Sequence, residues 1–185
     1  MATRARRLST VAIAAVLGAL FSPASGAGAT SASITVTAST LTLVNVPSVS
    51  FTDTLNGKDQ TPTATQAIDV GDATGSGAGW DITATSTTFT TGTVNLATTA
   101  TTVQSSPTVA CDAGATCVTA TNNVTYPYTL PAAGSAPTAT KVYNATANTG
   151  MGDQTVTITW QVAVPASTKA GTYNSTWTIS LVSGP

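Results

Sequence analysis

VTITWQVAV, residues 156–164, alternates apolar and polar side chains along its whole length. YNSTWTISL, residues 173–181, repeats this rhythm. The residues in the apolar phase are Val156, Ile158, Trp160, Val162 and Val164 in the first stretch, and Tyr173, Ser175, Trp177, Ile179 and Leu181 in the second. A period of two is typical of a strand with one face on a core, so each stretch is predicted to be a half-buried β-strand.

The link between these two stretches begins at Pro165 and carries Gly171 near its end, and both residue types favour turns. If the link closes an antiparallel hairpin symmetrically, Trp160 lies opposite Trp177 on the buried face. Directly opposed side chains in such a pair are about 5 Å apart. We therefore expect the two tryptophans to be cross-strand neighbours.

Threonine dominates the composition, with 41 of the 185 residues, and the chain contains no glutamate. Threonine is β-branched and favours strands, whereas among helix formers glutamate is absent and leucine is sparse after residue 29. Short alternating segments recur along the chain with turn residues between them, which is typical of a sandwich or barrel. We expect one all-β domain over residues 30–185, an Ig-like antiparallel β-sandwich.

Residues 1–29 have the three parts of a secretory signal peptide. Three arginines within residues 1–7 precede an apolar run over residues 8–21, and small residues end in Ala27-Gly28-Ala29. The apolar run is shorter than the roughly 20 residues that span a bilayer. We expect cleavage after Ala29, with Ala27 as second choice, and an extracellular protein; an uncleaved anchor is the alternative.

After cleavage the chain would keep three lysines and seven aspartates, a net charge of −4. Nucleic acids and anionic lipids both select basic surfaces, so we expect no nucleic-acid partner and no membrane insertion of the mature chain. Residues 183–185 include no hydrophobic tail or sorting signal. We expect any attachment to a cell to be a non-covalent contact made by the fold.

The two cysteines, Cys111 and Cys117, stand close together in CDAGATC. In an exported chain such a pair is typical of a disulfide, and the residues between them turn easily. A redox or zinc pair is the alternative, but a closed zinc site needs four ligands and the chain has no histidine. We expect a structural disulfide between Cys111 and Cys117.

The side chains that usually carry catalysis are scarce. Histidine, the commonest general base, is absent, and aspartate is the only acidic side chain. Asp69 and Asp72 are candidates for a carboxylate pair or for calcium ligands, but their setting, DVGDATGSGAG, is more typical of a turn. We expect no enzymatic activity, no cofactor and no metal site.

The tryptophans are the best candidates for ligand binding. An indole ring stacks on sugar rings, and Trp80 follows the glycine-rich segment Gly77-Ala78-Gly79. The same side chains are typical of a core, and Trp160 and Trp177 share the apolar phase of their stretches. The sequence leaves open whether these rings contact a ligand or build the fold.

The tryptophan contexts resemble a known family. GAGWDIT, residues 77–83, contains Trp80-x-Ile82, and YNSTWTISLVSGP, residues 173–185, contains Trp177-x-Ile179. Together with GMG at residues 150–152, VPASTKAGTY at 164–173 and LTLVNVPSVSF at 41–51, these motifs resemble the WxL domain of Gram-positive bacterial surface proteins. The chain departs from the family in reading Trp-x-Ile for Trp-x-Leu, in lacking the usual acidic residue near the end, and in carrying the cysteine loop.

This resemblance implies a module that attaches non-covalently to the bacterial cell wall, through peptidoglycan or another wall glycan. The positions carried over from the family are Trp80, Ile82, Trp177 and Ile179, which we take as tentative binding residues. Other surface proteins are possible partners. The alternative function is a structural subunit of a surface layer or fibre, assembled through β-strand edges.

Overall fold

A computed structural model describes residues 32–184, and the expected signal peptide, residues 1–29, lies outside them. The described residues form strands and no helix, and they therefore include no helix that could cross a membrane. The strands are β1 (Leu41–Asn45), β2 (Thr63–Asp72), β3 (Trp80–Thr87), β4 (Thr101–Val103), β5 (Thr108–Cys111), β6 (Tyr128–Thr129), β7 (Ala132–Ala133), β8 (Thr140–Ala145), β9 (Gly152–Val162) and β10 (Trp177–Ser183). The prediction of an all-β protein is confirmed.

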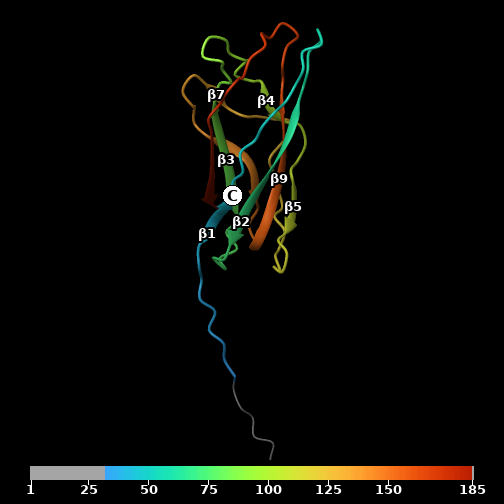
Figure 1. The fold of residues 1–185 in the computed structure, drawn as a ribbon. Helices are drawn as coiled ribbons and strands as arrows, with labels where there is room; N and C mark the ends of the chain where they lie inside the picture. The colour runs from blue at the N-terminus through green and yellow to red at the C-terminus, as the bar shows by residue number, and fades with distance from the viewer. Residues whose placement is uncertain (1–31, 185) are drawn as a thin grey trace, which may run out of the picture. The chain divides into compact units, whose positions relative to one another are not determined.

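The strands form two sheets, as expected of a β-sandwich (Figure 1). The first sheet has the order β1-β2-β9-β4-β6, with β5 also pairing with β9. The second sheet has the order β10-β3-β7, with β8 also pairing with β3. All pairs are antiparallel except β3 with β7. Strands distant in sequence therefore meet in both sheets.

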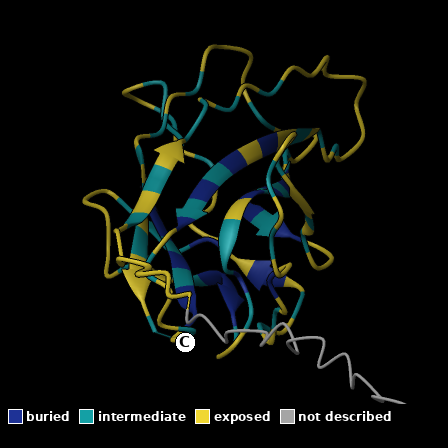
Figure 2. Ribbon diagram, turned by 90° about the horizontal axis from the view of Figure 1, so that it is seen from below, coloured by how far each residue is buried: buried dark blue, intermediate teal, exposed yellow. Residues whose placement is uncertain are grey.

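The core consists of the inward phases of the long strands. On β9 the alternation predicted from the sequence is confirmed, because Val156, Ile158 and Trp160 are completely buried. β2 contributes Ile68 and Val70 from the neighbouring position in the same sheet. Figure 2 shows that exposed residues gather in the loops, while buried and partly exposed residues alternate along strands. Burying these side chains is the main favourable contribution to folding.

The predicted hairpin between residues 156–164 and 173–181 is wrong. β9 pairs with β2, β4 and β5 in the first sheet, whereas β10 pairs with β3 in the second. The link after β9 therefore carries the chain from one sheet to the other. Trp160 and Trp177 do meet, with ring centroids 4.8 Å apart and an interplanar angle of 70°, but they come from different sheets. The shared inward phase placed both rings in the core, and the local pattern could not specify the strand partner.

The predicted disulfide is confirmed between Cys111, at the end of β5, and Cys117. The Cα atoms of the two cysteines are 5.6 Å apart. The enclosed loop turns back through a backbone hydrogen bond from Ala115 N–H to Asp112 C=O, 3.0 Å long. The disulfide therefore closes a short turn beside the start of β9, where Asp112 N–H donates to Asp153 C=O.

Replacing both cysteines by serine should lower the free energy of unfolding by about 2 kcal/mol, because the short closed loop no longer restricts the unfolded chain. Urea denaturation followed by tryptophan fluorescence measures the difference. Reducing the wild-type protein should give a similar decrease. An unchanged urea midpoint in both experiments would show that the disulfide does not stabilise the fold.

Candidate functional site

Trp80, the first tentative binding residue, is enclosed by the protein. Its side chain is completely buried, its Nε1 donates to the Gly150 carbonyl at 2.9 Å, and its ring centroid is 6.0 Å from that of Tyr143. Gly150 has φ +78°, and a Cβ there would lie 2.6 Å from Trp80 Nε1. Gly79, with φ +80°, leaves no room for a Cβ beside the Ala145 carbonyl. The glycines of GAGW and GMG therefore allow the chain to close around this indole.

The two Trp-x-Ile motifs lie on paired strands of the second sheet. In the register of β3 with β10, Ile82 is opposite Leu181, and Ile179 is opposite Ala84. Ile82 is completely buried, while Trp177 and Ile179 are half-buried against the same core. The structure thus brings the four tentative binding residues into one sheet. The burial of Trp80 and Ile82 favours a role in building the fold.

An aromatic cluster joins the two sheets around Trp177. The Trp177 ring centroid lies 4.8 Å from that of Trp160 and 6.3 Å from those of Phe51 and Phe89. Trp160 is buried, and its Nε1 donates to the side-chain oxygen of Gln66 at 2.9 Å. Because the Trp80 and Trp160 indole N–H groups already have protein acceptors, Trp177 is the tryptophan best placed to meet a ligand.

Two grooves flank this aromatic cluster. The first, which we call the loop groove, has a volume of about 670 Å³ and lies between residues 49–55 and residues 168–175. The second, which we call the edge groove, has a volume of about 450 Å³ and runs beside the start of β10, with Trp177 and Ile179 in its wall. Val49, Phe89 and Ser175 line both.

The loop groove combines apolar walls with polar groups. Phe51, Tyr173 and Leu55 supply the apolar surface, and Leu55 is 40 % exposed. Asp53 and Lys169 bring one charge of each sign, and the Tyr173 hydroxyl donates to the Lys169 carbonyl at 2.9 Å. Concave sites with aromatic walls and a few polar groups are typical of small-ligand and sugar binding.

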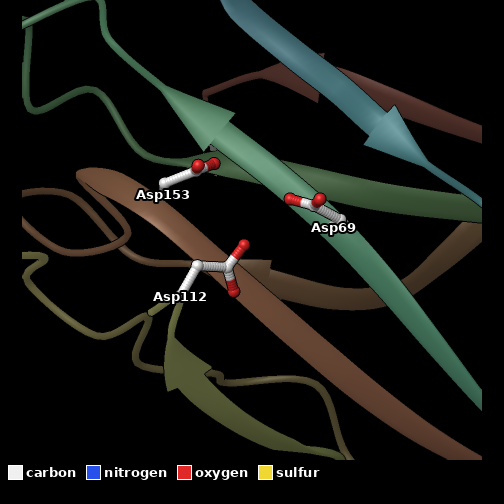
Figure 3. Close-up of side chains that lie close together, drawn as sticks. All are labelled: Asp69, Asp112 and Asp153. Carbon is white, nitrogen blue, oxygen red and sulfur yellow. The ribbon is translucent and has the colours of Figure 1, made fainter. Parts of the chain in front are cut away.

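An acidic cluster, Asp69, Asp112 and Asp153, lies on the outer side of the first sheet (Figure 3). Carboxylate oxygens of the three residues lie within 4.8 Å of one another, and Asp112 Oδ1 accepts a 2.7 Å hydrogen bond from the Thr155 hydroxyl. Burial, and then the neighbouring charges of Asp112 and Asp153, raise the pKa of Asp69. Oxygen ligands of this kind suit calcium, so this is where the described residues could hold a cation.

Asp72 does not join Asp69, although the sequence made the two candidates for one carboxylate pair. Asp72 ends the inward-facing phase of β2, and Asp69 belongs to the opposite phase. The Asp72 carboxylate accepts hydrogen bonds from Thr74 N–H at 3.0 Å and from the Thr74 hydroxyl at 2.7 Å. Asp72 therefore organises the glycine-rich turn that follows β2. The turn predicted to begin at Asp69 is wrong for residues 69–72, which belong to β2.

Two tyrosines of the fold, the buried Tyr143 and the partly buried Tyr126, are held in their neutral form. Burial raises the pKa of Tyr126 and of Tyr143 to about 12. The Tyr126 hydroxyl donates to the Val142 carbonyl at 2.7 Å, which fixes the side chain against β8. Both hydroxyls therefore act as hydrogen-bond donors within the fold at neutral pH.

Comparisons of the chain with protein-family models, with curated proteins and with solved structures found no match. The candidate surfaces are therefore described from their own geometry. Sequence reasoning pointed to the tryptophans and to Asp69, but it missed the loop groove and the two aspartates that lie beside Asp69, Asp112 and Asp153. Each of these sites is formed by segments that are far apart in the chain, so no local spacing of residues indicates it.

Trp80→Ala should lower the free energy of unfolding by about 3–5 kcal/mol, because it empties a completely buried site and orphans the Gly150 carbonyl. Urea denaturation of the variant and of the wild type measures this loss. Val182→Ala is the matched control, since Val182 is 48 % exposed and should change stability by less than about 0.5 kcal/mol. Equal losses in the two variants would contradict a structural role for Trp80.

Asp69→Asn should stabilise the protein at pH 7. A folded-state pKa above the unfolded value of 3.8 means that the native state favours the protonated carboxyl. The stabilisation that the protonated Asp69 carboxyl contributes to the folded state is therefore fully present below pH 3.8. This stabilisation is lost as the pH rises through the folded-state pKa of Asp69. Asparagine mimics the protonated form, so the advantage of the variant should shrink as the pH is lowered. Thermal unfolding of both proteins over a pH series tests this, and an advantage that grows toward acid would contradict it.

Proposed function

We propose that this protein is a secreted, non-enzymatic module that attaches non-covalently to wall glycan of a Gram-positive bacterium. The proposal rests on the resemblance of the Trp-x-Ile motifs to WxL domains, on the signal-peptide pattern of residues 1–29, and on the loop groove. As part of this proposal, the two sheets form an Ig-like β-sandwich. The wall and the extracellular space are the proposed location.

The loop groove is the observation that carries the proposal. It is built by residues 49–55 and 168–175, and these overlap LTLVNVPSVSF and VPASTKAGTY, two of the stretches on which the resemblance depends. The buried tryptophans would then build the fold, and the groove would meet the glycan. Phe51 and Tyr173 offer faces for sugar stacking, while Asn174, Asp53 and Lys169 offer polar partners for hydroxyl groups.

Co-sedimentation with purified peptidoglycan tests this proposal. The wild-type protein should pellet with the wall and saturate it, and the double variant Leu55→Ser, Tyr173→Ser should bind about tenfold more weakly because the groove loses apolar surface. Val44→Ser is the control, since Val44 is 56 % exposed on β1 and does not line the groove. Circular dichroism checks that all three proteins are folded.

Two outcomes would contradict the proposal. The wild-type protein could remain in the supernatant at every wall concentration, which would rule out wall binding. Alternatively, the double variant could pellet to the same extent as the wild type, which would rule out the loop groove as the contact surface.

The second candidate function is a structural subunit of a surface layer or fibre. One observation favours it: β10 lies at the edge of the second sheet and pairs, among the described strands, only with β3. An open strand edge is a template for another chain. Sedimentation velocity without any wall material separates this candidate from the first, because a fibre subunit should assemble under those conditions.

A further inference from the structure

β10 lies at an edge of the second sheet, and among the described strands it pairs only with β3. Its register with β3 runs from Trp177 opposite Ser86 to Ser183 opposite Trp80. Backbone hydrogen bonds from Thr87 N–H to Thr176 C=O and from Gly184 N–H to Gly79 C=O show which residues face β3. Because facing and outward residues alternate in an antiparallel ladder, the outward-pointing backbone groups belong to Trp177, Ile179, Leu181 and Ser183. No strand of residues 32–184 pairs with them.

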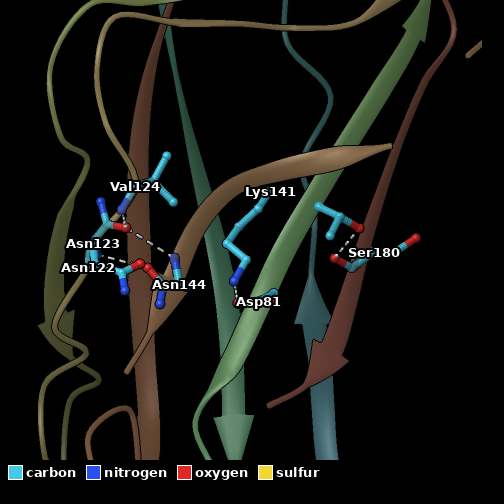
Figure 4. Close-up of polar contacts among 8 residues, drawn as sticks. Asp81, Asn122, Asn123, Val124, Lys141, Asn144 and Ser180 are labelled. Atoms are coloured by element: carbon cyan, nitrogen blue, oxygen red, sulfur yellow. Dashed lines mark hydrogen bonds and ion pairs between the residues drawn. The ribbon is translucent and has the colours of Figure 1, made fainter. Parts of the chain in front are cut away.

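The β8 edge of the same sheet is covered by residues 122 and 123 (Figure 4), whereas no described strand pairs with the outer edge of β10. Asn144 N–H donates to Asn122 Oδ1 at 3.2 Å, and Asn123 N–H donates to Asn144 Oδ1 at 2.9 Å. Lys141 of β8 also pairs with Asp81 at 2.9 Å. β10, by contrast, reads WTISLVS and contains neither a charge nor a proline, the usual protections of an edge strand.

The edge groove lies next to this open edge. Trp177 and Ile179 form one wall, and Val46 and Val49, from the segment after β1, form another. No charged residue lines it. A strand added to β10 would point alternate side chains to the core side of the sheet, as in recognition by strand addition. The groove therefore suits a strand with aliphatic residues at every second position.

This chain carries such a strand. The segment SITVT, residues 33–37, alternates Ile34 and Val36 with hydroxyl residues, and these two side chains are 89 % and 85 % exposed. Five extended residues span about 17 Å, enough to follow most of β10. Leaving two large aliphatic side chains in water forgoes the hydrophobic gain that burial in an apolar groove would supply.

The chain's own β10 is a poor acceptor for the SITVT segment. Ser39 N–H donates to Ala73 C=O at 2.9 Å, and Ala73 N–H donates to Thr40 C=O at 3.3 Å, so residues 39 and 40 extend the pairing of β1 with β2. Only Ala38 separates this ladder from residues 33–37. A strand that reversed to run back along β10 would need a connecting loop, and the commonest loops of that kind have two residues.

We propose that the SITVT segment of one copy adds as an edge strand to β10 of a second copy, with Ile34 and Val36 in the edge groove. The donor and acceptor surfaces differ, so the contact is head-to-tail and links copies into a chain. It does not depend on the proposed wall binding, and it gives the second candidate function a defined surface.

Sedimentation velocity over a concentration series tests the contact. The purified wild-type chain should gain mass with concentration, whereas Ile34→Asp, Val36→Asp should weaken association by about 100-fold because neither charged side chain can enter the groove. Both positions are exposed, so the variant should fold normally. Thr35→Asp, Thr37→Asp is the matched control, with the same added charge in the opposite phase of the strand. It should associate like the wild type.

A peptide locates the acceptor. A synthetic peptide of residues 31–38 should bind the Ile34→Asp, Val36→Asp protein and shift its fluorescence, since Trp177 lines the edge groove. The same peptide with aspartate at positions 34 and 36 should not. A wild-type protein that stays monomeric at all concentrations would overturn the proposal, and so would equal association of the two double variants. Because no wall material is present, none of these outcomes bears on wall binding.

Discussion

The contact between Trp160 and Trp177 is the interaction on which the rest of the structure depends. One ring comes from each sheet, and the rings meet edge to face in the interior, an arrangement that aromatic pairs favour. Gln66 accepts from the Trp160 indole and donates to the Pro47 carbonyl at 2.8 Å, so the segment after β1 is tied to the same point. Phe51 closes the cluster from that segment. A chain with few charges thus fixes the spacing of its sheets with aromatic side chains and the buried amide of Gln66.

The pairing of β3 with β10 gives the Trp-x-Ile motifs a physical reason. The strands read WDITATS and WTISLVS, and the antiparallel register sets Trp80 opposite Ser183 and Trp177 opposite Ser86. Each large ring therefore faces a small side chain, which lets two tryptophans share one sheet without crowding. Isoleucine suits the third position of each motif, because β-branched side chains pack well on a pleated surface.

The sequence predicted what depends on neighbouring residues and failed where distant segments had to be matched. Alternation identified the inward phase of β9, and the six-residue separation of the cysteines predicted their bond. The same alternation could not reveal that β10 belongs to another sheet, because period two is identical for every partner. β2 escaped notice because buried Gln66 and Asp72 interrupt its apolar phase. The acidic cluster was equally hidden, since strand register alone brings Asp69 to Asp112 and Asp153.

The burial of the tryptophans also limits where recognition can occur. Trp80 and Trp160 are completely buried and their indole N–H groups are satisfied within the protein, so a partner must be met by loops and edges. Both grooves border the same aromatic cluster, with Phe89 lining each of them. A ligand in one groove would therefore contact side chains that also line the other, namely Val49, Phe89 and Ser175. The fold thus places the loop groove and the edge groove on two sides of one aromatic cluster.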